Sequence, residues 1–228
     1  MSYVTRALDR RLNALLPEVP AIAIDGPKGV GKTATALQRA DTVWMLDREE
    51  TLLVAAADPD FLTVEAGTFL LDEWQKLPSV WDAVRRQVDA GAPAGRFLLT
   101  GSATPFDANG THSGAGRILS LRMRPMALFE RGLTQPSVSL GALLSDPDQA
   151  VEGRTDFALP DYCRAIARSG FPGIMGKSAE VTQELLDSYL RLIVDRDLPD
   201  YGATVRRPET LRRWLAAYAA ASSQTTSY

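Results

Sequence analysis

The 228-residue sequence is poor in the residues that build covalent or metal-based scaffolds, with one cysteine and one histidine. A single cysteine, Cys163, excludes an internal disulfide framework, and no cysteine–histidine cluster predicts a zinc site. The histidine, His112, lies in a stretch rich in glycine, serine and asparagine, which favours a loop residue over a catalytic base. Disulfide-stabilised and zinc-dependent classes of protein are therefore excluded.

The sequence also lacks long apolar runs and a strong excess of one charge. No segment approaches the ~18 consecutive apolar residues of a membrane-spanning helix. Charged residues interrupt the first sixteen positions, so these do not form the core of a signal peptide, and a cytoplasmic protein is expected. Residues 3–16 have the spacing of an amphipathic helix instead. The net charge of −3 provides no general electrostatic attraction to nucleic acid.

What the sequence does contain is the motif G-x-x-x-x-G-K-T, between an apolar run at 21–24 and a helix-forming stretch at 34–40. Strand, glycine loop and helix start together direct backbone N–H groups at one point, which suits a polyphosphate. The predicted nucleotide-binding residues are Gly26, Pro27, Lys28, Gly29, Val30, Gly31, Lys32, Thr33 and Ala34.

Two residues of the motif carry distinct chemistry. Lys32 is expected to reach the β- and γ-phosphates, and the Thr33 hydroxyl is expected to ligate Mg²⁺. ATP and Mg²⁺ are therefore the expected ligands.

The rest of the first half alternates strands with helices. Such alternation predicts a parallel sheet with helices on both faces, and ligands bind such sheets at the carboxyl ends of their strands. The predicted fold is α/β, a P-loop NTPase with a three-layer α/β/α parallel sheet followed by a small helical region. Its predicted domains are a P-loop ATPase domain at 1–131, a connector at 132–160 and a helical C-terminal region at 161–228.

Two acids follow the buried strand that ends at residue 71. Asp72 is predicted to support the phosphate-bound Mg²⁺, directly or through water. Glu73 is predicted to act as the general base that polarises a water for attack on the γ-phosphate. A hydrolytic glutamate at this position favours an ATPase over a small-molecule kinase.

Further candidates are the hydroxyls that end the strand at 96–102 and an arginine after a glycine-rich loop. Thr100 and Ser102 could sense the γ-phosphate or orient the water, or they could cap the strand end. Arg117 could stabilise charge on the γ-phosphate, in its own subunit or across an interface, or it could form a surface ion pair.

These strings form an ordered series that resembles a known family. The specific parts are Asp-Glu-Trp-Gln-Lys-Leu-Pro at 72–78 and Leu-Thr-Gly-Ser at 99–102, followed by Gly-Arg at 116–117 and Gly-Phe-Pro at 170–172. The series resembles the prokaryotic AAA-type ATPases that carry a C-terminal domain of unknown function. The resemblance implies an ATPase module coupled to a helical, winged-helix-like region that runs on for well over a hundred residues. Because this chain stops at residue 228, a fragment or a truncated product is expected, with an apolar face near Trp214 and Tyr218 left exposed.

The leading hypothesis is a Mg²⁺-dependent ATPase that works as a switch, with the loop near 104–117 ordered by ATP. The first alternative is a P-loop kinase that uses the segment 117–124 as a lid. The second is a non-enzymatic, nucleotide-gated module that binds DNA or protein. Expected partners are an unidentified protein or the missing C-terminal region, a second copy of the chain, and, for the second alternative, DNA, but no membrane.

Overall fold

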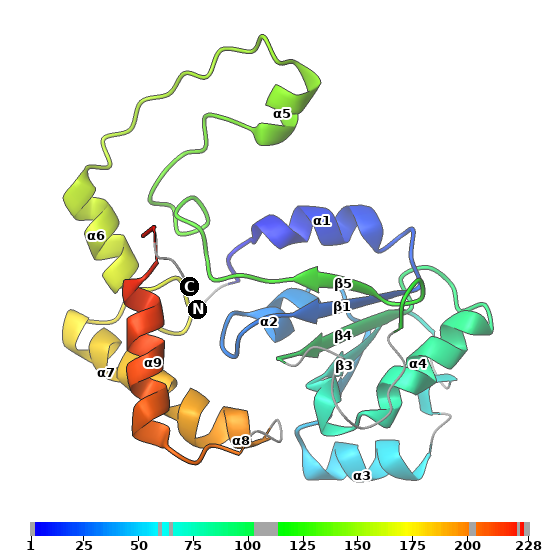
Figure 1. Cartoon of the computed structure of the whole chain (residues 1–228). Coiled ribbons are helices and arrows are strands. Elements are labelled where there is room, and N and C mark those ends of the chain that lie inside the picture. The colour runs from blue at the N-terminus through cyan, green and yellow to red at the C-terminus, as the bar shows by residue number, and fades with distance from the viewer. Residues whose placement is uncertain are drawn as a thin grey trace. The chain divides into compact units, whose positions relative to one another are not determined.

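The computed structural model of the chain describes residues 3–58, 61–63, 66–102, 114–200, 204–222 and 224–225. It divides into two compact units, Met1–Gly173 and Ile174–Tyr228 (Figure 1). The domain limits expected from the sequence stay a prediction, and His112 lies outside the described residues.

A five-stranded parallel sheet forms the centre of the first unit. Its strands lie in the order β2-β3-β4-β1-β5, and every neighbouring pair is parallel. The strands are β1 (Ala21–Asp25), β2 (Thr42–Met45), β3 (Phe69–Asp72), β4 (Phe97–Gly101) and β5 (Leu119–Arg122). The predicted parallel α/β fold is confirmed. β4 separates the strand that leads into the glycine loop from the strand that ends in the acids.

Two apolar cores cover the two faces of this sheet, because alternate side chains of a strand point to opposite faces. On one face, Leu12 of α1 and Ala36 of α2 pack with strand residues such as Leu98. On the other face, Trp81 and Val84 of α4 pack with the alternate positions of the same strands. The helices are α1 (Ala7–Leu15), α2 (Lys32–Ala36), α3 (Glu49–Ala57) and α4 (Ser79–Asp89), with short 3-10 turns at Phe61–Thr63 and Trp74–Lys76. The result is the expected three-layer arrangement (Figure 1).

The first unit continues beyond the sheet through α5 (Leu140–Ser145) and α6 (Leu159–Ala167). The segment that follows α6 returns to the core of the first unit. Phe171 packs against the core that contains α1 and α2, and Met126 N donates to Gly170 O at 2.8 Å. The Gly-Phe-Pro string therefore fastens the end of the first unit to the chain that follows β5.

The second unit is helical. It contains α7 (Ala179–Leu192), a π-helical turn at Ile193–Asp197, α8 (Leu198–Asp200) and α9 (Pro208–Ala220). Arg212 of α9 pairs with Asp195 at 2.6 Å, which fixes α9 to the π-helical turn. Trp214 and Tyr218 stack at 5.4 Å and are both more than half exposed. None of the described helices has the length and apolar character needed to cross a membrane.

Candidate functional site

The glycine loop joins β1 to α2 at the carboxyl edge of the sheet. Gly26 has a φ of 149°, and a Cβ at this position would lie 2.3 Å from the carbonyl oxygen of Met123. Gly31 also has a positive φ, of 107°. The close approach of the chain after β5 therefore requires glycine at 26, and the left-handed backbone favours glycine at 31.

Lys32 is buried inside this loop, with 5% of the residue exposed. Its ammonium donates to the carbonyl oxygens of Gly26 at 2.9 Å and Pro27 at 3.1 Å. Burial lowers the pKa of Lys32 below its usual value, and the nearby carboxylates of Glu73 and Asp72 oppose this shift. A buried ammonium with a lowered pKa gains stabilisation from any anion that enters the loop.

Three predicted residues meet at one carboxylate. Thr33 Oγ1 donates to Asp72 Oδ1 at 2.7 Å, and Thr100 Oγ1 donates to the same oxygen. Asp72 and Thr100 are register partners on β3 and β4, so their side chains share a face of the sheet with α2. Both are buried, with 5% and 1% exposed. The structure thus brings together the glycine loop and the first acid of the pair.

This donor set consists of one carboxylate and two hydroxyls. These are hard oxygen ligands, and Mg²⁺ takes such ligands together with phosphate oxygens and water. Among the described residues, no cluster of three or more histidine, cysteine or acidic side chains could hold a metal by itself. The residues present fit a magnesium ion that shares its coordination with a bound phosphate.

Glu73 follows directly and has a left-handed backbone, with φ 54° and ψ 43°. Its carboxylate accepts a hydrogen bond from Gln75 Nε2, which also reaches Ser102 Oγ at 3.4 Å. The turn that carries Gln75 lies over β4, because a Cβ at Gly101 would meet Gln75 Oε1 and Trp74 Nε1 at 2.6 Å. Gln75 therefore links the second acid to the hydroxyl after β4.

Arg117 is not brought to this edge. It lies two positions before β5, and the parallel strands all begin at the opposite, amino edge. There Arg117 Nε donates to Asp89 Oδ1 at 2.9 Å, at the end of α4, with 47% of the side chain exposed. The segment 117–124, the candidate kinase lid, contains β5, which is a strand of the sheet.

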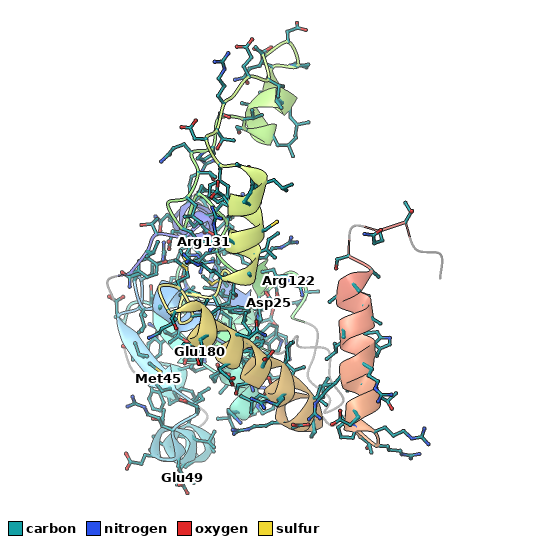
Figure 2. The ribbon with its side chains drawn as sticks, turned by 90° about the vertical axis from the view of Figure 1, so that its left-hand side faces the viewer. Asp25, Met45, Glu49, Arg122, Arg131 and Glu180 are labelled. Atoms are coloured by element: carbon teal, nitrogen blue, oxygen red, sulfur yellow. The ribbon has the colours of Figure 1, made fainter. Side chains whose placement is uncertain are left out.

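The remaining residues of the predicted nucleotide-binding set belong to the same loop and helix. Val30 is buried in the core beside α1, and Lys28 is close enough to Lys32 for its positive charge to lower the Lys32 pKa. At the adjoining strand ends, Asp25 and Arg122 are register partners (Figure 2). Asp25 Oδ1 is buried without a hydrogen-bond partner in the described part of the chain.

Sequence reasoning missed two residues of this edge, Gln75 and Arg6. Gln75 belongs to the string at 72–78, but a glutamine two positions after a glutamate does not by itself predict a contact between the two side chains. Arg6 is one of several charges among the first sixteen residues, and its burial depends on contacts with residues far along the chain. The backbone of Arg6 is extended, with φ −102° and ψ 152°. For this reason α1 begins at Ala7, later than the start at residue 3 that the amphipathic pattern predicts.

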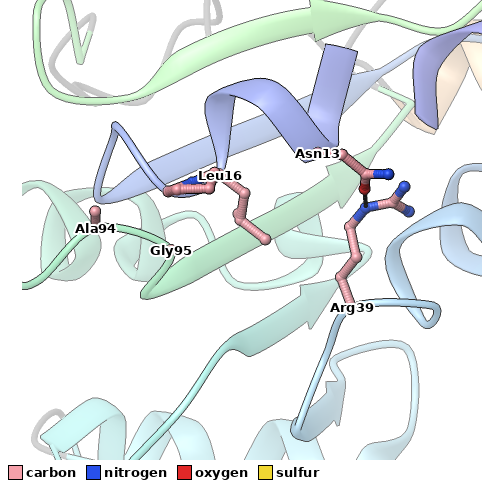
Figure 3. Close-up of a pocket in the computed structure, with 6 residues that line it drawn as sticks. Asn13, Leu16, Arg39, Ala94 and Gly95 are labelled. Atoms are coloured by element: carbon pink, nitrogen blue, oxygen red, sulfur yellow. Dashed lines mark hydrogen bonds between the residues drawn. The ribbon is translucent and has the colours of Figure 1, made fainter. Parts of the chain in front are cut away.

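A hollow of about 360 Å³ lies away from these residues, at the amino edge (Figure 3). Among the described residues that line it, Arg39 is the charged side chain; it donates to Asn13 Oδ1 at 2.9 Å and pairs with Asp9 at 2.8 Å. Because these contacts occupy the guanidinium, the hollow offers no chemistry comparable to that of the carboxyl edge.

Comparison with known proteins agrees with this geometry. A family model described as an AAA domain matches residues 18–131, a range that contains all five strands and every predicted catalytic, nucleotide-binding and metal-binding residue. Two uncharacterized proteins, from Mycobacterium bovis and Mycobacterium tuberculosis, are each 27% identical to this chain over 217 residues. These alignments cover 91% of this chain and 43% of each relative, so the chain spans less than half the length of these curated relatives.

Proposed function

The chain belongs to the AAA domain family, and we propose that it binds ATP with Mg²⁺ at the carboxyl edge of the sheet and hydrolyses it. The family indicates nucleotide binding of the ATPase kind. Hydrolysis, the metal and the role of each residue are the parts proposed here.

One observation carries the proposal. The Thr33 hydroxyl and the Asp72 carboxylate approach to 2.7 Å, although 39 positions separate them in the sequence. The phosphate loop and the acid strand therefore converge on one point, where a metal-bound polyphosphate needs both.

In the proposed reaction, water attacks the γ-phosphorus and its proton passes to Glu73. The bond from the γ-phosphorus to the bridging oxygen breaks, and ADP and phosphate leave. Lys32 binds the phosphates, and Thr33 and Asp72 hold the metal. The chemistry that Mg²⁺ supplies when bound is neutralisation of charge on the phosphate oxygens.

Neighbouring residues support these roles in two ways. Thr100 donates to Asp72 and so orients the carboxylate that faces the metal. Gln75 donates to Glu73 and so fixes the proposed base.

Arg117 has no proposed role within its own subunit because it lies at the opposite edge. A role across an interface stays a prediction, and a steep rise of specific activity with protein concentration would support it.

The test compares two site variants with two matched surface variants. Lys32→Ala is expected to abolish nucleotide binding, and Glu73→Gln is expected to bind ATP but stall its hydrolysis. Lys177→Ala and Glu49→Gln change exposed residues of the same types, the second in the first turn of α3 (Figure 2), and should behave as wild type. Release of free phosphate in water alone supports an ATPase, whereas transfer to an added acceptor would indicate a kinase. Wild-type turnover in Glu73→Gln would show that Glu73 is not the base.

The proposal extends to a switch in which the nucleotide state controls the helices of residues 174–228. A protein partner, or the additional length found in the relatives, would respond to these helices. Limited trypsin digestion of Glu73→Gln with ATP or with ADP tests this idea, because a switch predicts different cleavage of α7–α9. Titration with DNA over a salt series, with and without ATP, tests the alternative of a DNA-binding module.

A further inference from the structure

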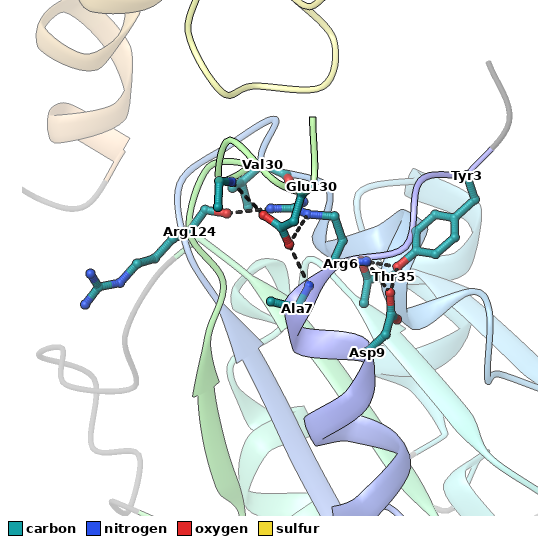
Figure 4. Close-up of polar contacts among 9 residues, drawn as sticks. Tyr3, Arg6, Ala7, Asp9, Val30, Thr35, Arg124 and Glu130 are labelled. Carbon is teal, nitrogen blue, oxygen red and sulfur yellow. Dashed lines mark hydrogen bonds and ion pairs between the residues drawn. The ribbon is translucent and has the colours of Figure 1, made fainter. Parts of the chain in front are cut away.

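A buried arginine contacts the phosphate loop from outside the predicted motif. Arg6 lies just before α1, and only 4% of its side chain is exposed (Figure 4). Its Nη1 donates to the carbonyl oxygen of Val30 at 2.8 Å, and its Nη2 donates to that of Arg124 at 2.7 Å. Nη1 also lies 3.3 Å from the place of a Cβ on Gly31. One guanidinium therefore holds both the loop and the chain that follows β5.

The charge of Arg6 is matched by an equally buried partner. Glu130, with 6% of its side chain exposed, accepts from Arg6 Nε at 3.1 Å and from Ala7 N at 2.6 Å through Oε1. Its other oxygen accepts from Ala127 N at 2.7 Å. A buried ion pair is tolerated when its remaining hydrogen-bonding groups are satisfied, and this carboxylate has three donors.

The contact with Val30 has a geometric consequence for phosphate binding. In a trans peptide the carbonyl oxygen and the N–H point in opposite directions. Because Arg6 holds the Val30 oxygen on the outer side of the loop, the N–H of Gly31 in the same peptide points to the other side. On this placement the Gly31 N–H would point toward the interior of the loop, where Lys32 Nζ meets the carbonyls of Gly26 and Pro27.

We propose that Arg6 is a positioning residue of the phosphate loop. Through Val30 it fixes the direction of the Gly31 N–H, and Glu130 holds the guanidinium in place. The effect on nucleotide affinity rests on the proposed function, but the effect on the backbone of the loop does not.

The experiment uses the full chain in four forms: wild type, Arg6→Lys, Glu130→Gln and Arg85→Lys. Lysine keeps the charge of Arg6 but cannot reach three acceptors in the fork geometry of a guanidinium. Arg85 is the control, because it pairs with Asp82 and Asp89 on α4 and does not contact the loop in the described structure. Backbone ¹⁵N order parameters are measured for Val30 and Gly31, and calorimetry measures the affinity for Mg²⁺–ATPγS.

The expected order parameters of the loop fall from about 0.85 in wild type toward about 0.6 in Arg6→Lys and fall less far in Glu130→Gln. Leu70 and Leu98 in the strands should keep their values in all four proteins. The affinity for Mg²⁺–ATPγS should weaken about tenfold in Arg6→Lys, the effect of losing one hydrogen bond to a charged group. Turnover at saturating ATP should change much less than the affinity does.

Unchanged order parameters of Val30 and Gly31 in a folded Arg6→Lys protein would overturn the inference. This holds even if the melting temperature of the variant falls, because Arg6 would then stabilise the fold without positioning the loop. If Arg6→Lys does not fold, Glu130→Gln decides by the same two measurements. If wild type does not bind Mg²⁺–ATPγS, the proposed function fails while the order parameters still test Arg6.

Discussion

Two charged sites at opposite edges of the same parallel sheet differ in how deeply their side chains are buried. At the carboxyl edge, Arg6, Lys32 and Asp72 are each at most 5% exposed, and all have short contacts with backbone or side-chain partners. At the amino edge, the ion pair of Arg117 with Asp89 leaves 47% and 41% of the two side chains exposed. Both sites combine aspartate with basic side chains, so the two sites differ in burial and not in residue type.

This difference shows where charge has a defined position. An exposed ion pair gains little because water competes for both partners and the side chains lose freedom. A buried one is costly unless it is fully hydrogen-bonded, so its geometry is fixed. Chemistry that depends on direction is therefore expected at the carboxyl edge, and the following variants test that comparison from the largest effect to the smallest.

The largest difference is expected between two aspartates, one at each edge. Asp72→Asn should weaken Mg²⁺-dependent binding of ATPγS by about 100-fold, because the neutral amide is a poor magnesium ligand and brings no negative charge to the metal. Asp89→Asn should leave this affinity unchanged. Calorimetry with and without Mg²⁺ measures both, and equal losses in the two variants would remove the distinction between the edges.

A second difference concerns a glycine in the carboxyl edge. Gly101→Ala places a methyl group 2.6 Å from Trp74 Nε1 and Gln75 Oε1, and Trp74 cannot move freely because it packs on Trp81 at 4.8 Å. We expect a loss of about 1–3 kcal/mol in the free energy of unfolding. Gly173→Ala is the control because a Cβ there meets nothing within 4 Å. Urea unfolding of both variants measures the effect, and a stability for Gly101→Ala equal to the control contradicts it.

A third prediction uses pH. Burial would raise the pKa of Asp9, but hydrogen bonds from the Tyr3 hydroxyl, the Arg6 N–H and Arg39 outweigh it and lower the pKa. A lowered folded pKa gives stability that is present above the unfolded value of about 3.9 and is lost as the pH falls through the folded value. Asp9→Asn should therefore cost about 1 kcal/mol at pH 7.

The same variant provides its own control for this third prediction. Because asparagine does not titrate, the difference in unfolding free energy between wild type and Asp9→Asn should narrow as the pH falls below about 4. Urea unfolding at several pH values follows it. A difference that stays constant down to pH 2 would mean that the ionised carboxylate is not what stabilises this region.

The smallest effect is expected at the amino edge. Arg117→Ala removes an exposed ion pair, so the melting temperature and the turnover in dilute solution should stay close to wild type. Thermal melting and phosphate release measure the two. A large loss of turnover would place Arg117 in the chemistry of a neighbouring subunit and would break the contrast between the edges.

The sequence was sufficient to predict the parallel sheet and the convergence of Thr33 with Asp72. Both depend on local patterns. Buried strands appear as apolar runs, and in a parallel sheet every motif that directly follows a strand lies at the carboxyl edge. The region around Arg6 depends instead on contacts that span 24, 118 and 124 positions, and no local period reports such contacts. For Arg117, the neighbouring glycine suggested a functional loop. Only the parallel direction of β5 shows that the residue before this strand lies at the amino edge of the sheet, away from the glycine loop.

Strand β4 also determines how widely the two halves of the site are spaced. Adjacent strands lie about 4.8 Å apart, so placing one strand between β1 and β3 separates the loop and the acids by about two such steps. Thr100 crosses part of that interval, because it is the register partner of Asp72. Inserting a single residue between 97 and 99 would turn Thr100 to the other face while leaving every side chain of the motif intact. The register of this one central strand is thus a point at which an insertion could inactivate the site although no site residue is substituted.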